Sequence, residues 1–241
     1  MILDMRATSL SLPTPRITRV EPIGPRGLTV RVHLDEGDPL EVMLEALEFS
    51  RLGSGDVLSA DARTRLLDAD ADIRVREAAL TLLSYRARTR QELRRKLRGK
   101  RFDPARIDAC LARLEERGLL CDAAVAAAFV RDRLRLRPSG RTRLASELRA
   151  KGVEAEVAQE TIALVFEDEE VSDTDLARGA AEAWLARQPS QVSSALASRT
   201  HTPASGKAKR RLYGYLTRRG FRGDAMHAAL VHAEALAAER P

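Results

Sequence analysis

Arginine side chains are the residues of this sequence whose type and spacing could support binding chemistry. A guanidinium group forms bidentate hydrogen bonds with a phosphate or a carboxylate. On a helix that carries the Leu93–Leu97 stripe, Arg95 and Arg98 point away from the core. Arg131 and Arg135 share another face one turn apart, and such like charges repel by about 0.2–0.5 kcal/mol unless an anion offsets them. We therefore expect an anionic partner, and the candidate partner-binding or nucleic-acid-binding residues are Arg94, Arg95, Arg98, Arg131, Arg135, Arg141, Arg143, Arg149, Lys151, Arg218 and Arg219.

The residue patterns of catalytic and metal sites are missing from the sequence. A phosphate-binding loop needs glycines ending in Lys and Ser or Thr, whereas Gly206-Lys207 is followed by Ala208. The acidic run 167–170 spreads its carboxylates over different helix faces and has no histidine nearby. Cys110 falls in an apolar helical segment, and Cys121 has no neighbouring histidine to lower its pKa. We expect a protein that is not an enzyme and that uses no metal or cofactor.

Charge is distributed unevenly along the 241 residues. Residues 1–73 hold 8 basic and 13 acidic side chains, and residues 74–151 hold 22 basic and 9 acidic. Residues 152–190 reverse this with 2 basic and 10 acidic side chains, and residues 191–241 hold 9 and 3. Self-repulsion in the basic block favours an external polyanion or acidic protein surface as partner, with a merely solvated arginine-rich surface as the alternative.

Hydropathy gives no membrane or export signal. No run approaches the 18 or so apolar residues of a membrane span, and the first sixteen residues lack an apolar stretch of signal-peptide length. We expect a cytoplasmic protein without membrane association.

The periodicity predicts a mainly helical fold with a small N-terminal β-hairpin region. Apolar residues alternate with polar ones over 28–34 and again over 40–44, with turn residues between them, and 17–23 can add an edge strand that contains Pro22. From Asp56 onward the pattern is helical, with an expected break around the acidic run 68–72.

An internal repeat organises the rest of the chain. Leu93, Leu97 and Phe102 align without gaps with Leu144, Leu148 and Val153, and with Leu212, Leu216 and Phe221. Each copy predicts a short helix, a turn and a second amphipathic helix, preceded by a further helix: 75–85, 122–136 and 173–187. Gly152 and Gly220 occupy the turn position that favours positive φ, whereas Arg101 occupies it in the first copy, where we expect a different turn.

Three-helix units of this kind are expected to stack into an elongated, solenoid-like body. The Ser- and Thr-rich stretch 189–206 predicts a mobile loop inserted into the third unit, and Trp184 is expected in its core. The expected organisation is a disordered start (1–15), a β-hairpin region (16–55), a connecting helix (56–73) and three repeats (74–121, 122–170 and 171–241).

Several linked motifs resemble the bacterial RecX family. A Leu-rich helix, an Arg-rich turn and a Glu-Leu pair form its opening signature, which the stretch Ala79–Leu93 matches. The further matching segments follow in the family's order: Arg117–Asp122, Phe129–Arg133, Pro138–Gly140, Arg143-Leu144, Glu147-Leu148, Lys151–Val153 and Arg218–Phe221. The resemblance covers about residues 75–235.

The resemblance implies a regulator of the RecA recombinase. Such a protein is expected to bind the RecA filament on single-stranded DNA, to lie along its groove, and to suppress recombinase, ATPase and co-protease activities. It is expected to act as a monomer, and single-stranded DNA is contacted directly or through the filament.

Two other functions remain open from the residues themselves. One repeat could act as a helix-turn-helix that binds duplex DNA directly, although Asp103 and Glu154 would place acids at the starts of the recognition helices. A structural adaptor without a filament role is the third hypothesis. Titration against bare DNA at two salt concentrations separates these functions.

Overall fold

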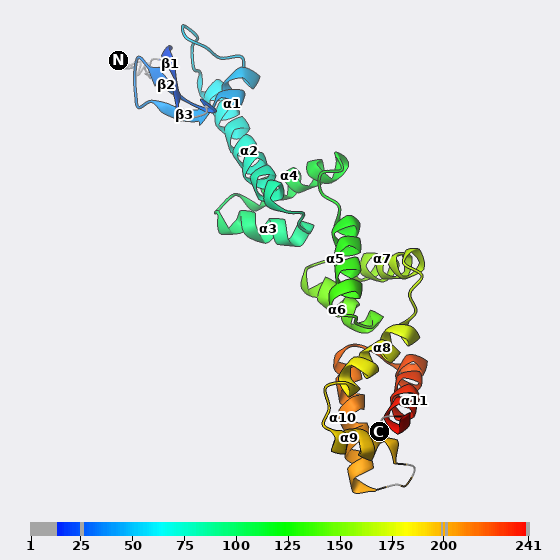
Figure 1. Cartoon of the computed structure of the whole chain (residues 1–241). Helices are drawn as coiled ribbons and strands as arrows, with labels where there is room; N and C mark the ends of the chain where they lie inside the picture. Colours follow the sequence, from blue (N-terminus) through cyan, green and yellow to red (C-terminus); the bar gives the residue numbers. More distant parts are fainter. Residues whose placement is uncertain (1–13, 25–26, 199, 201, 240–241) are drawn as a thin grey trace, which may run out of the picture. The chain divides into compact units, whose positions relative to one another are not determined.

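A computed structural model of the chain describes residues 14–24, 27–198, 200 and 202–239. Three strands and eleven helices lie in this described part (Figure 1). The described residues form two compact units: one contains those up to Arg86 together with Lys96–Arg113, and the other contains Ala87–Arg95 together with those from Leu114 onward. A mainly helical fold with a small N-terminal β region, as the sequence predicts, is confirmed. Most of the expected disordered start lies outside the described residues.

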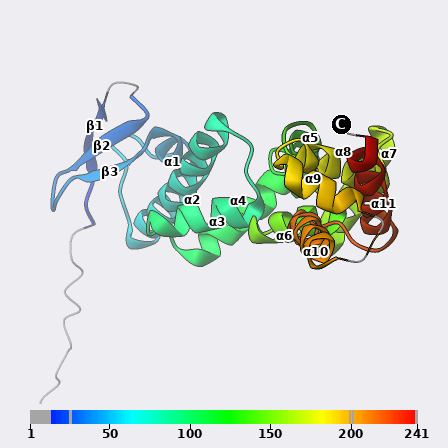
Figure 2. The same ribbon diagram turned by 60° about the horizontal axis from the view of Figure 1, so that its bottom comes forward.

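The N-terminal sheet is antiparallel, with strand order β1-β2-β3. The strands are β1 (Ile17–Ile23), β2 (Thr29–Leu34) and β3 (Leu40–Met43), so the predicted hairpin and its edge strand are confirmed. One face of the sheet buries Ile17, Val32 and Val42 against α1 (Leu44–Phe49) and the start of α2 (Ala60–Tyr85), beside the sheet in Figures 1 and 2.

The acidic run 68–72 does not break the helix, and this prediction is wrong. Helix α2 runs from Ala60 to Tyr85 without interruption. Asp70 is almost fully buried, accepts a hydrogen bond from the backbone N–H of Met43 (2.6 Å), and pairs with Arg74 (2.7 Å). Asp68 and Asp72 both bind the guanidinium of Arg106, at 2.6 and 2.7 Å. Partners distant in the sequence thus offset the mutual repulsion of these carboxylates within the helix.

The repeated segments form helices in the predicted order. The first copy contributes α3 (Arg90–Gly99) and α4 (Pro104–Glu116), and the second contributes α5 (Asp122–Leu136), α6 (Arg141–Ala150) and α7 (Ala155–Asp168). Gly152 and Gly220 have the expected positive φ, at 85° and 84°. Arg101 has a φ of 65° at the matching position, so the first copy shares the left-handed residue. The turn still differs as expected in one respect: the N–H groups of Val153 and Phe221 donate to the carbonyl oxygens of Leu148 and Leu216 (both 3.1 Å), and the described first copy has no such bond from Phe102 to Leu97. The repeat imposes the same left-handed residue even where no glycine is present.

The third repeat contains four helices instead of three. They are α8 (Asp173–Leu185), α9 (Ser190–Ala197), α10 (Pro203–Arg218) and α11 (Gly223–Glu239). The predicted 189–206 loop is therefore wrong over most of its length, because α9 buries Leu196 against this bundle and α10 begins at Pro203, capped by the Thr202 side chain. Residues 199 and 201 lie outside the described part.

The second and third repeats each have a hydrophobic cluster within the same compact unit. The second is built around Leu144, Leu148 and Phe166, and the third around Leu212, Leu216 and Phe221. Trp184 and Cys110 are buried, as the sequence predicts. Among the described helices, none is long and apolar enough to cross a membrane.

Candidate partner-binding arginines

The N-terminus of α3 is fixed by a buried threonine. The Thr89 hydroxyl accepts a hydrogen bond from the N–H of Glu92 (3.1 Å) and donates one to the carbonyl oxygen of Lys151 (2.6 Å). Further along α3, Arg95 and Arg98 are exposed, as helical phase predicts, and they make no ion pair with any other described residue. Both guanidinium groups are available to a partner.

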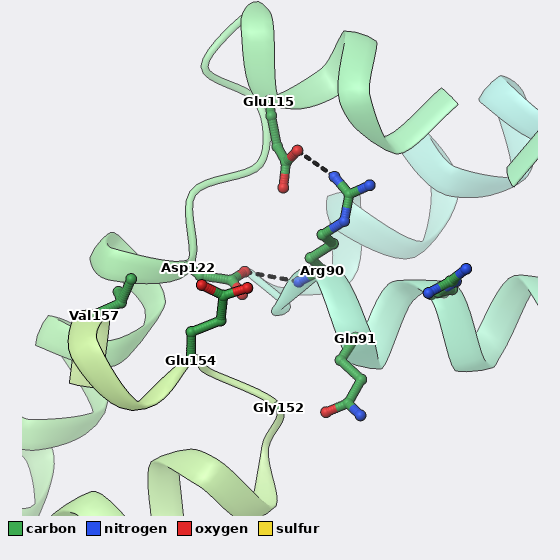
Figure 3. Close-up of a pocket in the computed structure, with 8 residues that line it drawn as sticks. Arg90, Gln91, Glu115, Asp122, Gly152, Glu154 and Val157 are labelled. Carbon is green, nitrogen blue, oxygen red and sulfur yellow. Dashed lines mark hydrogen bonds and ion pairs between the residues drawn. The ribbon is translucent and has the colours of Figure 1, made fainter. Parts of the chain in front are cut away.

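Arg94, by contrast, is half-buried and lines a pocket of about 600 Å³ beside the start of α3. Figure 3 shows this pocket, with Arg90, Asp122 and Glu154 among its labelled residues. The backbone N–H of Arg90 donates to Asp122 (2.7 Å), and its guanidinium pairs with Glu115. Burial raises the pKa of the Asp122 carboxyl above its ordinary value, with the N–H of Arg90 acting against that shift. Glu154 is the third carboxylate that lines the pocket, after Glu115 and Asp122, and only two arginines line it. The positive and negative charges therefore nearly balance, and the pocket does not suit a polyanion.

Gly152 allows the turn after α6 to approach α3 closely at this pocket. A Cβ at residue 152 would lie 1.7 Å from the side-chain oxygen of Gln91. The turn after α6 can therefore touch α3 only because it carries a glycine there.

The two arginines predicted to share a face on α5 find their anions within the chain. Arg131 pairs with Asp168 and Glu169, both at 3.0 Å, and Arg135 pairs with Asp132 at 2.9 Å. Their mutual repulsion thus needs no external partner to offset it.

Two more candidates, Arg141 and Arg143, join the second and third repeats. Arg141 pairs with Asp173 (2.9 Å) and its guanidinium carbon lies 4.0 Å from the centre of the Phe166 ring. Arg143 bonds to Glu147 (2.8 Å) and donates to the carbonyl oxygen of Arg218 (2.6 Å).

Arg219 and Lys151 also have internal contacts. The Arg219 guanidinium donates to the carbonyl oxygen of Pro138 (2.8 Å). Lys151 lies 4.0 Å from a Glu92 oxygen and 5.2 Å from the Phe129 ring centre. These contacts give both residues a structural role.

Four of the eleven candidates keep exposed guanidinium groups without an ion pair in the described part of the chain. They are Arg95, Arg98, Arg149 and Arg218. Three further arginines escaped the sequence argument because they lie outside the repeat positions it compared: Arg133, Arg137 and Arg187 line one pocket together with Arg143 and Arg219. The Arg-rich end of α5 was the available signal for two of them.

The His, Cys, Asp and Glu side chains of the described residues form no metal-binding cluster, since no group of three or more of them could hold a metal ion. Burial raises the pKa of the Cys110 thiol, which disfavours a reactive thiolate. The arrangement is suited to binding through charged side chains.

Comparison with known proteins gives one consistent family. A family model described as the first three-helix domain of RecX matches residues 76–114, and one described as its second three-helix domain matches residues 122–162. Regulatory protein RecX of Halorhodospira halophila is 36% identical over 160 residues, which cover 66% of this chain and 88% of the relative. Regulatory protein RecX of Amycolatopsis mediterranei is 34% identical over 148 residues, covering 61% of this chain and 76% of the relative.

The same family appears among solved structures. A crystal structure of regulatory protein RecX matches with a TM-score of 0.69 at 21% identity, over 89% of this chain and 98% of that one. At this identity, the likeness shows a shared fold.

Proposed function

This chain belongs to the RecX family of regulatory proteins, and from that premise we propose that it binds the RecA filament on single-stranded DNA and inhibits its recombinase, ATPase and co-protease activities. The protein acts in the cytoplasm, in DNA repair and recombination, without catalysing a reaction itself. It works as a monomer whose contacts are made by charged side chains.

The observation that carries this proposal is the set of exposed arginines that form no ion pair with another described residue. Arg95, Arg98, Arg149 and Arg218 are exposed in a chain that pairs many of its other arginines. Guanidinium groups without a counter-ion suit the phosphates of a DNA strand and the carboxylates of a protein surface, and a nucleoprotein filament offers both.

Charge reversal at three of these arginines tests the proposal. The triple variant Arg95→Glu, Arg98→Glu and Arg149→Glu should lose inhibition of the recombinase ATPase on single-stranded DNA while circular dichroism stays helical. A matched control reverses three exposed arginines elsewhere, at Arg63, Arg65 and Arg210, and should keep its inhibition. Equal inhibition by both variants and the unmodified protein would remove these three residues from the contact surface.

Stoichiometry distinguishes two ways of acting on the filament. Inhibition at amounts far below one protein per recombinase protomer favours capping of filament ends, and inhibition near one-to-one favours occupancy of the groove. Failure to inhibit at any ratio would refute the proposed function.

Direct reading of duplex DNA has less support. The recognition helix of a helix-turn-helix presents its first residues to the bases. Helices α4 and α7 begin directly after Asp103 and Glu154, and the Asp103 carboxylate accepts a hydrogen bond from the N–H of Arg106 (3.0 Å). Carboxylates at these positions would face DNA phosphates.

A further inference from the structure

Five arginines converge on one pocket of about 390 Å³ within the second compact unit. Arg133 comes from α5, Arg137 from the turn after it, and Arg143 from α6. Arg187 comes from the segment after α8, and Arg219 directly follows α10. Glu147 of α6 is the one carboxylate among the lining residues. We call this site the arginine pocket.

Glu147 neutralises only part of this charge. It accepts hydrogen bonds from the Nε of Arg133 (2.7 Å) and the Nε of Arg143 (2.8 Å). Burial raises the pKa of the Glu147 carboxyl, but the hydrogen bonds and charges of these two arginines outweigh it and leave the pKa below its ordinary value. The carboxylate therefore stays ionised at neutral pH, and five positive charges face one negative charge.

The remaining arginines have no counter-ion in the pocket. Arg219 is held by the Pro138 carbonyl oxygen (2.8 Å) and lies 5.1 Å from the ring centre of Tyr215, which positions the guanidinium without neutralising it. Arg137 and Arg187 are exposed and have no ion pair with any residue that the structure describes. Three guanidinium groups held in place and two free ones form a preorganised site for an anion.

We propose that the arginine pocket binds the phosphodiester backbone of a single-stranded nucleic acid. The charge density favours phosphate over carboxylate, because a strand brings one charge every few ångströms, whereas a protein loop rarely presents so many acids in one place. The Arg fork matches two phosphate oxygens, and the exposed side chain of Leu136 at the same pocket offers an apolar surface to a sugar or base. This inference rests on the proposed function in that it gives the regulator its own contact to the strand inside the filament.

The test measures binding of the full chain to a fluorescein-labelled dT homopolymer by anisotropy, without recombinase, over a range of salt concentrations. The double variant Arg137→Gln and Arg187→Gln should flatten the plot of log K against log salt by about 1.4, since each phosphate contact on a single strand contributes about 0.7. The ratio of wild-type to variant affinity should therefore shrink about sevenfold between 50 and 200 mM salt.

The control variant Arg210→Gln and Arg222→Gln removes the same charge from exposed positions outside the pocket and should leave the slope unchanged. Fluorescence of Trp184 reports whether both variants remain folded in this unit. An unchanged slope in the pocket variant, an equal loss in the control, or no binding of the bare strand by the wild type would overturn the proposal.

Two competitors identify the source of the anion. A glutamate oligomer and tripolyphosphate, each matched to the strand in total charge, should displace the homopolymer far less well than unlabelled dT does. Equal displacement by the glutamate oligomer would assign the pocket to an acidic protein, and equal displacement by tripolyphosphate would assign it to a free phosphate compound. The recombinase ATPase assay is separate, because a wild type that binds the strand but fails to inhibit refutes the proposed function and leaves the pocket assignment standing.

Discussion

Replacing Gly220 by alanine should weaken the junction between the second and third repeats. Gly220 follows α10 with a φ of 84°, and a Cβ there would lie 2.5 Å from the backbone nitrogen of Arg143. Gly140 packs against Gly220 at this point. The N–H of Gly140 donates to the Arg219 carbonyl oxygen (2.9 Å), and a Cβ added to Gly140 would lie 2.5 Å from the Gly220 carbonyl oxygen. Two backbone segments thus touch where neither residue has a side chain.

The cost of the Gly220→Ala change has two parts. Holding an alanine in the left-handed region costs about 1–2 kcal/mol. The clash adds about 1–3 kcal/mol, because the atoms it meets belong to the backbone and cannot move aside like a flexible side chain. Gly223→Ala is the matched control: its φ is 54° and an added Cβ would meet no atom within 4 Å, so it should show the first cost alone.

Trp184 provides the assay. It is the one tryptophan of the chain and belongs to the buried cluster that contains Phe221, so its fluorescence follows unfolding of this part. With a urea m-value of about 2 kcal/mol/M, Gly220→Ala should unfold at a midpoint about 1 M below that of Gly223→Ala. Equal midpoints for the two variants would refute the reasoning, since they would show that the close backbone contact carries no energy beyond the positive φ.

Three other substitutions test single contacts. The pKa of Glu147 is lowered in the folded state, so its ion pairs stabilise the protein above the ordinary pKa of 4.5 and are lost as the pH falls through the lowered value. The urea unfolding curves of Glu147→Gln and wild type should therefore differ most at neutral pH and converge in acid. A difference that stays constant with pH would contradict this. Arg101→Gly should raise the midpoint of thermal unfolding measured by calorimetry. Relief of the positive φ of Arg101, reduced by the greater entropy that glycine gives the unfolded chain, should increase the free energy of unfolding by up to about 1 kcal/mol. A lower midpoint would mean that the arginine side chain itself stabilises the turn. Thr89→Val should cost about 1–3 kcal/mol in the Trp184 unfolding assay because the Lys151 carbonyl and the Glu92 N–H lose their partner, whereas Thr89→Ser should cost much less; equal losses would point to packing of the methyl group instead.

Much of the fold follows from local pattern. Alternation predicts the hairpin, and the helical period places the ends of α5 at Asp122 and Leu136, where the structure has them. The two wrong predictions about helices share a cause. Weak local helix signals are common to the acidic run 68–72 and the Ser-rich stretch 189–206. Both are helical because of residues distant in the sequence: Arg106 pairs with the acidic run, and the hydrophobic cluster of the third repeat packs around Leu196. The boundaries between the repeats stay predictions.

Helical phase predicts which arginines are exposed but cannot predict which are paired. Arg95 and Arg98 point outward as expected, yet so does Arg131, whose partners lie 37 and 38 residues away. Pairing of this kind is set by tertiary structure, and no spacing rule within one helix could reveal it.

The paired arginines change the meaning of the charge blocks. The acidic block 152–190 supplies Asp168, Glu169 and Asp173 to arginines of the basic block, so part of the positive charge that suggested an external polyanion is neutralised inside the chain. Substituting a paired arginine should therefore weaken stability and binding together, and it would say little about the partner. Only exposed arginines without an ion pair in the described part of the chain, such as Arg149 or the pair Arg137 and Arg187, can separate recognition from folding, and the binding experiments above are confined to arginines of that kind.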